Sequence, residues 1–188
     1  MTITNKLGLT DETQLLQKEE EISKKKCIEL FEKATFNKLK GGSIEALVKL
    51  NKYLFGEIYD CAGKLKPELK TQLDTIEKMP QTTTDEIFEK YIALSSLKPF
   101  EVGNGRTTRL WLDSILRKEK NLTIDWNKID KDAFILATEF NSNESEKAKT
   151  LLENALSNET DSREVFIKSI DANFAISGLK TYRTRVLG

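Results

Sequence analysis

The sequence contains no histidine, so it lacks the side chain most often used as a proton acceptor near neutral pH. Its only cysteines, Cys27 and Cys61, do not have a metal-ligand spacing, and we expect reduced thiols. No apolar run is long enough to span a bilayer, and the first residues lack the apolar core of an export signal. These absences argue against a membrane partner and predict a cytoplasmic protein.

The charges of the chain are balanced. Its 188 residues include 30 basic and 30 acidic side chains, so no global field would attract nucleic acid, and we expect no such partner. The locally basic residues Lys180, Arg183 and Arg185 are more typical of a solvated terminus than of a binding arm. With 38% hydrophobic residues the chain can bury a sizeable core. We expect one domain that covers residues 1–188.

Apolar residues recur at helical spacing through most of the chain, and no segment has a convincing strand pattern. This periodicity predicts an all-α fold of about eight helices. Thr10 with Asp11, Ser43 and Asp130 are expected helix starts, and Asp161 with Glu164 has the spacing of a capping box. The apolar positions that mark the helices include Leu15, Ile22, Ile28, Leu47, Leu54, Leu73, Ile76, Phe88, Tyr91, Phe134, Leu152, Phe166 and Ile170.

The most informative segment is KPFEVGNGRTTR, residues 98–109. Gly103 and Gly105 enclose Asn104, so the main chain can bend there and approach a ligand closely. The next residues predict an amphipathic helix whose apolar face contains Leu110 and Trp111, followed by Ile115 and Leu116. The free N–H groups at the start of that helix would favour an anion above the loop.

Arg106 and Arg109 lie three residues apart in the first turn of the same helix. This spacing places both guanidinium groups on one side, where they can bind two different phosphates. Positive charge opposes the helix dipole at this end, which disfavours a purely structural role. The alternative is that the arginines pair with acids of the scaffold, such as Asp113. We interpret the phosphate-binding site as Gly103, Asn104, Gly105, Arg106 and Arg109.

The segment resembles the signature of Fic proteins, HPFx(D/E)GNGRxxR, enzymes that transfer AMP from ATP to a hydroxyl group of a target protein. The similarity extends from LVKLNKYLFGEIYDCAGKLK, residues 47–66, to SREVFIKSIDANFAISG, residues 162–178. It implies a Fic-fold helical bundle, ATP as the cofactor and a protein as the target. The later stretch resembles the C-terminal inhibitory helix of a self-inhibited subclass. Residues 162–188 are therefore expected to be regulatory, and self-association into a homo-oligomer is plausible.

Two positions that carry the family's chemistry have changed. The family's general base is a histidine where this sequence has Lys98, and an ammonium group has no lone pair to accept a proton. Lys98 could act as a base only if burial lowered its pKa enough for the ammonium group to lose a proton. The family's metal-binding carboxylate corresponds to Val102, which has no oxygen for Mg²⁺, and Glu101 should point elsewhere. We expect no metal ligands by the inherited route.

Two further departures concern target binding and regulation. Fic enzymes carry a β-hairpin flap after the AGK segment, and it pairs with the main chain of the target. Here Lys66 is followed by Pro67, a helix start, so the flap is expected to be missing. The family's inhibitory glutamate pairs with the second motif arginine. This chain has Asn173 and Ser177 before Gly178, so its regulatory segment offers Arg109 no carboxylate.

Two functional hypotheses follow. The favoured one is a catalytically impaired Fic protein that retains a loop for a nucleotide or another phosphate ligand and acts by binding a partner protein. The alternative is an active transferase of AMP or another phosphate-bearing group. In that case Lys98 replaces the base and Glu101 recruits magnesium.

Overall fold

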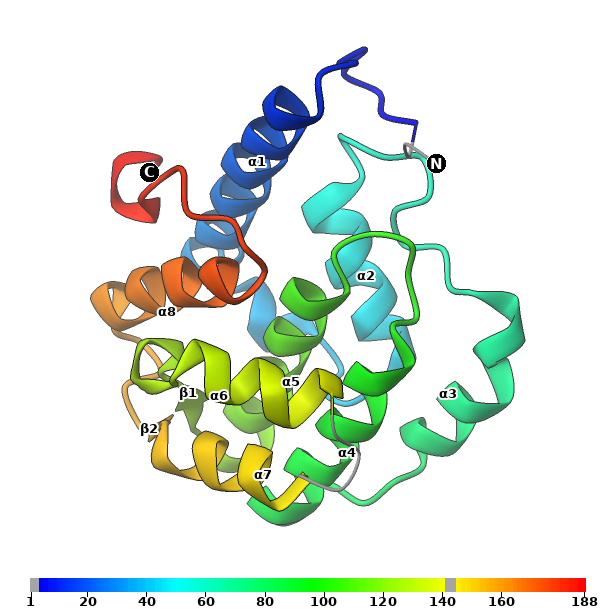
Figure 1. The fold of residues 1–188 in the computed structure, drawn as a ribbon. Coiled ribbons are helices and arrows are strands. Elements are labelled where there is room, and N and C mark those ends of the chain that lie inside the picture. Colours follow the sequence, from blue (N-terminus) through cyan, green and yellow to red (C-terminus); the bar gives the residue numbers. More distant parts are fainter. Residues whose placement is uncertain (1–3, 141–144) are drawn as a thin grey trace.

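The computed structural model describes residues 4–140 and 145–188, and most of them are helical (Figure 1). These residues form eight α-helices, in agreement with the predicted number. Short 3₁₀ turns lie between them, and a π-helical turn follows the sixth helix directly. The helices are α1 Glu12–Glu32, α2 Ile44–Phe55, α3 Lys70–Glu77, α4 Thr84–Leu97, α5 Asn104–Lys120, α6 Lys131–Ile135, α7 Ser145–Asn154 and α8 Arg163–Ile176.

Short polar side chains start several helices where the sequence predicts them. Asp11, Ser43 and Asp130 each accept a hydrogen bond from a backbone N–H of the first turn of α1, α2 and α6. At α8 the prediction that Asp161 caps the helix N-terminus was wrong. Ser162 is the N-cap there, since it directly precedes the first helical residue and its hydroxyl accepts from the third helical N–H.

A two-stranded antiparallel sheet was not predicted. Strand β1, Thr123–Ile124, pairs with β2, Leu156–Ser157, and so ties the end of α5 to the end of α7. The backbone N–H of Asp125 extends the pairing to the carbonyl of Ala155, 2.9 Å away. Strands of two residues are too short to show an alternating pattern, so only the pairing of distant segments reveals them.

Helix α5 lies at the centre of the fold and packs against α2, α4 and α8 (Figure 1). Every residue from Arg106 to Leu116 is buried, so the prediction of one buried apolar face was incomplete. The polar residues on the other side are buried because they find partners inside. The Asp113 carboxylate accepts from the Thr123 hydroxyl at 3.0 Å and from the Ile124 N–H at 2.9 Å.

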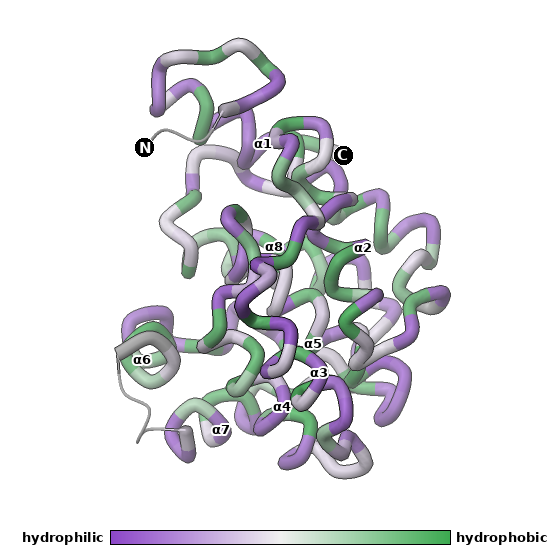
Figure 2. The backbone as a smooth tube through the Cα atoms, turned by 90° about the vertical axis from the view of Figure 1, so that its right-hand side faces the viewer, coloured by the Kyte–Doolittle hydropathy of each residue, from purple (hydrophilic) through white to green (hydrophobic). Residues whose placement is uncertain are grey.

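The core is one continuous hydrophobic cluster to which all eight helices contribute. Hydrophobic and hydrophilic residues alternate along the helices in Figure 2, as expected for helices that each bury part of their surface. Members from successive helices are Leu30, Leu54, Leu73, Phe88, Trp111, Phe134, Leu152 and Phe174.

The chain reaches α3 from the AGK segment without a flap. Residues 64–69, all of which the structure describes, contain no β-hairpin and end in a 3₁₀ turn, Pro67–Leu69. The N–H of Lys66 donates to the carbonyl of Pro99 at 3.0 Å. The segment that would carry the hairpin therefore lies directly against residues 98–103.

The described helices include none that is long and apolar enough to cross a membrane. Cys27 and Cys61 are free thiols, the first fully buried and the second half-buried. Burial raises the pKa of the Cys27 thiol to about 12, so it is protonated and unreactive at neutral pH.

Candidate functional site

The loop between α4 and α5 is shaped by residues with left-handed backbone. Lys98 ends α4 at φ 47°, and Gly103 precedes α5 at φ 70°. A Cβ atom on Gly103 would lie 2.1 Å from a ring carbon of Phe55, so only glycine fits. No side chain caps the N-terminus of α5, which leaves its first N–H groups directed over the loop.

Asn104 holds this loop in shape. Its side chain accepts from the N–H of Phe100 at 2.8 Å and donates to the carbonyl of the same residue at 2.7 Å. Because both ends of the amide are used, Asn104 offers a ligand its backbone N–H rather than its side chain.

Asn51 of α2 supports the loop from beneath, and it is a site residue that the sequence analysis does not name. It is fully buried, and its amide nitrogen donates to the carbonyl of Val102 at 3.0 Å and to the Thr107 hydroxyl at 3.1 Å. Its amide oxygen accepts from the N–H of Gly63 at 2.7 Å. The signal in the sequence that could have identified Asn51 is a single amide side chain on a helix face that is otherwise apolar.

Arg109 binds the C-terminal half of α8. Its Nε donates to the side-chain oxygen of Asn173 at 2.7 Å, and one Nη donates to the carbonyl of Asn173 at 2.9 Å and to the Ser177 hydroxyl at 2.7 Å. Its guanidinium lies 5.7 Å from the centroid of the Trp126 ring. The end of α8 thus reaches Arg109 through an amide oxygen, a backbone carbonyl and a hydroxyl.

Arg106 turns toward α1 instead. One Nη lies 2.5 Å from a carboxylate oxygen of Glu19, and the hydroxyl of Tyr59 donates to the same carboxylate. The guanidinium stacks 4.6 Å from the Phe55 centroid and 5.4 Å from that of Phe174. Residues three apart on a helix differ by about 60° in direction, which is enough for the two arginines to reach different helices.

Glu19 is a site residue that the sequence analysis missed. It is buried, and it follows Leu15 by four positions and precedes Ile22 by three. An acid on the same face as these apolar residues is costly to bury without a partner. That position was the available signal that Glu19 pairs with a buried cation.

Two buried N–H groups at the site have no acceptor among the described residues. They are the second Nη of Arg106 and the side-chain nitrogen of Asn173. Buried donors are nearly always satisfied in folded proteins. Their place beside the uncapped start of α5 is consistent with an oxygen-rich ligand.

A small pocket, hereafter the motif pocket, opens beside the start of α5 and encloses about 50 Å³. Its described lining includes two cationic side chains, Lys98 and Arg109, and no carboxylate. Burial raises the pKa of Tyr91 to about 12, so this lining residue remains a neutral phenol. The lining consists of Tyr91, Ser95, Lys98, Asn104, Gly105, Thr108, Arg109, Phe134 and Thr138.

Comparison with known structures identifies this architecture. BepC, a VirB-translocated effector from Bartonella tribocorum crystallised with AMPPNP, is 18% identical and superposes with a TM-score of 0.67 over 84% of this chain and 93% of that one. A Fic domain from Bartonella quintana with bound ADP gives 17% identity and a TM-score of 0.66 over 89% and 94% of the two chains. The chain has the Fic fold.

Sequence comparison adds curated relatives and no family model. The protein adenylyltransferase VbhT of Bartonella schoenbuchensis is 25% identical over 159 residues, which cover 71% of this chain and 32% of VbhT. The chain therefore spans about a third of the length of this relative. A search of family models found no match.

Within the Fic fold, the two changed motif positions have well-defined surroundings. Lys98 is exposed at the end of α4 and lines the motif pocket. Val102 is buried, and no cluster of three potential metal ligands occurs in residues 4–140 and 145–188. Glu101 lies beside Cys61, whose pKa is raised by burial and by the neighbouring Glu101 carboxylate. The donors present do not fit the inherited magnesium site.

Proposed function

We propose that this Fic-fold chain binds the phosphate groups of a nucleotide at the N-terminus of α5 and is catalytically impaired. The observation that carries the proposal is the uncapped start of α5, where Arg106 in the first turn and Asn173 of α8 have buried N–H donors without acceptors among the described residues. The nucleotides found in two structures of the same fold support the ligand class. The residues that would hold the phosphates are Gly103, Asn104 through its backbone N–H, Gly105, Arg106 and Arg109.

The conformation described by the structure is closed to such a ligand. The motif pocket encloses about 50 Å³, enough for a few water molecules, whereas ligand pockets usually need at least about 300 Å³. Both arginines already have internal ligands, Glu19 on one side and Asn173 with Ser177 on the other. Nucleotide binding therefore requires that at least the Glu19 carboxylate give way to a phosphate.

The proposed loss of catalysis follows from the residues that surround the proposed phosphate site. ATP would supply the adenylyl group, but the described lining of the motif pocket contains no carboxylate and the chain has no histidine to accept a proton from an attacking hydroxyl. Lys98 lines the same pocket and is suited to hold a phosphate by its charge. We assign it a binding role.

We also propose that residues 1–188 form a single Fic domain in which 162–188 are regulatory. Support comes from the three hydrogen bonds that Asn173 and Ser177 of this segment accept from Arg109. An amide and a hydroxyl hold a guanidinium less strongly than a carboxylate would. The segment is therefore a weaker competitor of phosphate at Arg109 than Glu19 is at Arg106.

Calorimetric titration with ADP and ATP tests the nucleotide proposal. Glu19→Gln keeps the shape of the side chain and removes the charge that occupies Arg106, so ADP affinity should rise about tenfold, or about 1.4 kcal/mol. Tyr59→Phe, which removes one hydrogen bond to Glu19, should raise it less. Arg109→Ala should weaken binding at least about tenfold, and the effect of magnesium should be small.

Glu21→Gln is the matched control, since Glu21 lies on the same helix and pairs only with the exposed residues Lys18 and Lys25 in the described structure. Its ADP affinity should equal that of the wild type. Thermal unfolding of each variant establishes that it is folded. If neither nucleotide binds the wild type, Glu19→Gln or Tyr59→Phe at millimolar concentration, the proposal is wrong and the motif has a structural role.

A further inference from the structure

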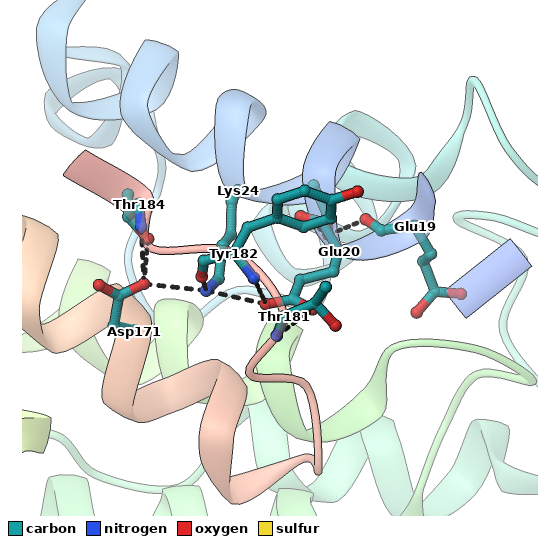
Figure 3. A network of polar contacts seen from close by, with 8 residues as sticks. Glu19, Glu20, Lys24, Asp171, Thr181, Tyr182 and Thr184 are labelled. Carbon is teal, nitrogen blue, oxygen red and sulfur yellow. Dashed lines mark hydrogen bonds and ion pairs between the residues drawn. The ribbon is translucent and has the colours of Figure 1, made fainter. Parts of the chain in front are cut away.

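The segment Leu179–Gly188 is held against α1 and α8 by a buried polar network, shown in Figure 3. The Glu20 carboxylate accepts from the backbone N–H groups of Thr181 and Tyr182 at 3.0 and 3.1 Å. Lys24, which is 1% exposed, donates to the carbonyl of Tyr182 and to Asp171. The sequence predicts a solvated terminus for this basic stretch, but its backbone is fixed by these contacts.

The fixed segment and one face of α8 enclose a surface hollow of about 360 Å³, hereafter the basic hollow. Lys168, Ala172 and Ala175 line it from α8, and their spacing places them on a single face of that helix. Lys180 and Arg183 line it from the segment. Asn173 and Ser177, which bind Arg109, lie on the other side of α8, so the basic hollow is separate from the motif pocket.

The charges around the basic hollow are not balanced by acids. Asp171 is the only acid in its described lining, and its Oδ1 already accepts from Lys24 and from both the N–H and the hydroxyl of Thr184. Within the described residues, Lys180 and Arg183 have no acidic partner within ion-pair distance. Lys168 pairs with Glu164 at 2.8 Å, but both side chains are exposed and such pairs are weak.

We propose that the basic hollow is a second anion site, which binds a compact multivalent oxyanion of the pyrophosphate type. Three exposed cations around one concave surface repel each other, and a multivalent anion relieves that repulsion. The network on Glu20 and Lys24 orders the backbone that carries Lys180 and Arg183 before any ligand arrives, which lowers the entropy cost of binding. The small side chains of Ala172 and Ala175 leave room for the anion.

Titration of the full chain with sodium pyrophosphate, at an ionic strength of about 50 mM to limit screening, tests the second site. The double variant Lys180→Ala with Arg183→Ala should bind at least about tenfold more weakly than the wild type. The matched control is Lys118→Ala with Lys120→Ala, which removes two exposed charges from the end of α5 and should bind like the wild type. Thermal unfolding should show equal stability for both double variants, because all four side chains are exposed.

Amide chemical shifts separate this site from the motif pocket. Pyrophosphate should shift the signals of Ala172, Ala175 and Thr181 in the wild type but not in the Lys180/Arg183 double variant. Shifts confined to 103–106, or equal weakening by both double variants, would overturn the proposal. Tighter binding of a triglutamate peptide than of pyrophosphate would also overturn it, since the basic hollow would then select an acidic chain.

Discussion

Gly103 has two separate reasons to be glycine. Its backbone is left-handed at φ 70°, and a Cβ atom would overlap the Phe55 ring, which itself stacks on Arg106. Left-handed backbone costs a residue with a side chain about 1 kcal/mol, whereas overlap with a packed ring adds about 1–3 kcal/mol. The second effect links the loop to the arginine beside it.

Gly103→Ala should therefore lower the free energy of unfolding by about 2–4 kcal/mol, measured by urea denaturation. Gly178→Ala is the matched control, since Gly178 also has positive φ, at 84°, but no atom within 4 Å of an added Cβ. It should cost only about 1 kcal/mol. Equal losses in the two variants would show that the Phe55 contact contributes nothing.

The position of the loop follows from the residues themselves, whereas the partners of its polar side chains do not. The glycines and arginines of the motif were found from their spacing, but Asn104 proved to be bonded to Phe100 and Arg106 to Glu19. Spacing along a helix indicates where a side chain leaves the backbone. It does not indicate which distant residue the side chain contacts in the folded protein.

At the scale of elements, α1, α8 and the segment Leu179–Gly188 are joined by buried charges. Burial on its own would raise the pKa of Glu20, but hydrogen bonds from Lys24 and from the backbone of Tyr182 and Thr181 outweigh it, and the pKa is lowered. A carboxyl group whose pKa is lowered on folding stabilises the protein above its unfolded pKa. That stability is lost as pH falls through the folded pKa.

The wild type should hence lose stability as pH drops below about 4, the region beneath the ordinary glutamate pKa. Glu20→Gln should be less stable at pH 7 by about 3 kcal/mol, because the buried Lys24 then keeps only the partly exposed Asp171 as an acidic partner. It should also lose less stability between pH 5 and 3. Urea denaturation at several pH values measures both effects. The exposed Glu45→Gln serves as control and should follow the wild-type profile, whereas parallel profiles for wild type and Glu20→Gln would contradict this account.

The elements that sequence periodicity missed are the short ones. Caps such as Asp11 and Ser43 follow from local chemistry, since the capping bond joins residues three apart. Strands β1 and β2 depend on a pairing between residues more than 30 positions apart. A local pattern does not contain that information.

For the molecule as a whole, α5 is both the central core helix and the carrier of the proposed anion site. Its first turn is surrounded by α1, α2 and α8, so a ligand must compete with contacts that also stabilise the fold. The resemblance to Fic enzymes implied a flap for target docking, and residues 64–69 provide no such edge. Transfer to a target should therefore fail at target binding as well as at the chemistry.

Restoring Lys98→His and Val102→Glu together should give no labelling of proteins in a cell lysate with radiolabelled ATP. The new base would still face a target that is not docked, and the introduced carboxylate would replace the Val102 side chain, which is only 8% exposed. The wild type should also give no labelling of lysate proteins. Wild-type labelling that disappears in Lys98→Ala would establish the transferase alternative, and strong labelling by the double variant would refute the role given to the missing hairpin.

The sequence by itself determined the helical class, several helix starts and the loop with its two arginines, because these depend on interactions between residues a few positions apart. Only the tertiary structure decided that Glu19 occupies Arg106 and that Asn173 occupies Arg109, through contacts that span 87 and 64 residues. It also decided that a basic stretch near residue 183 frames a hollow. Long-range partners are fixed by packing of the whole chain, which no local pattern records.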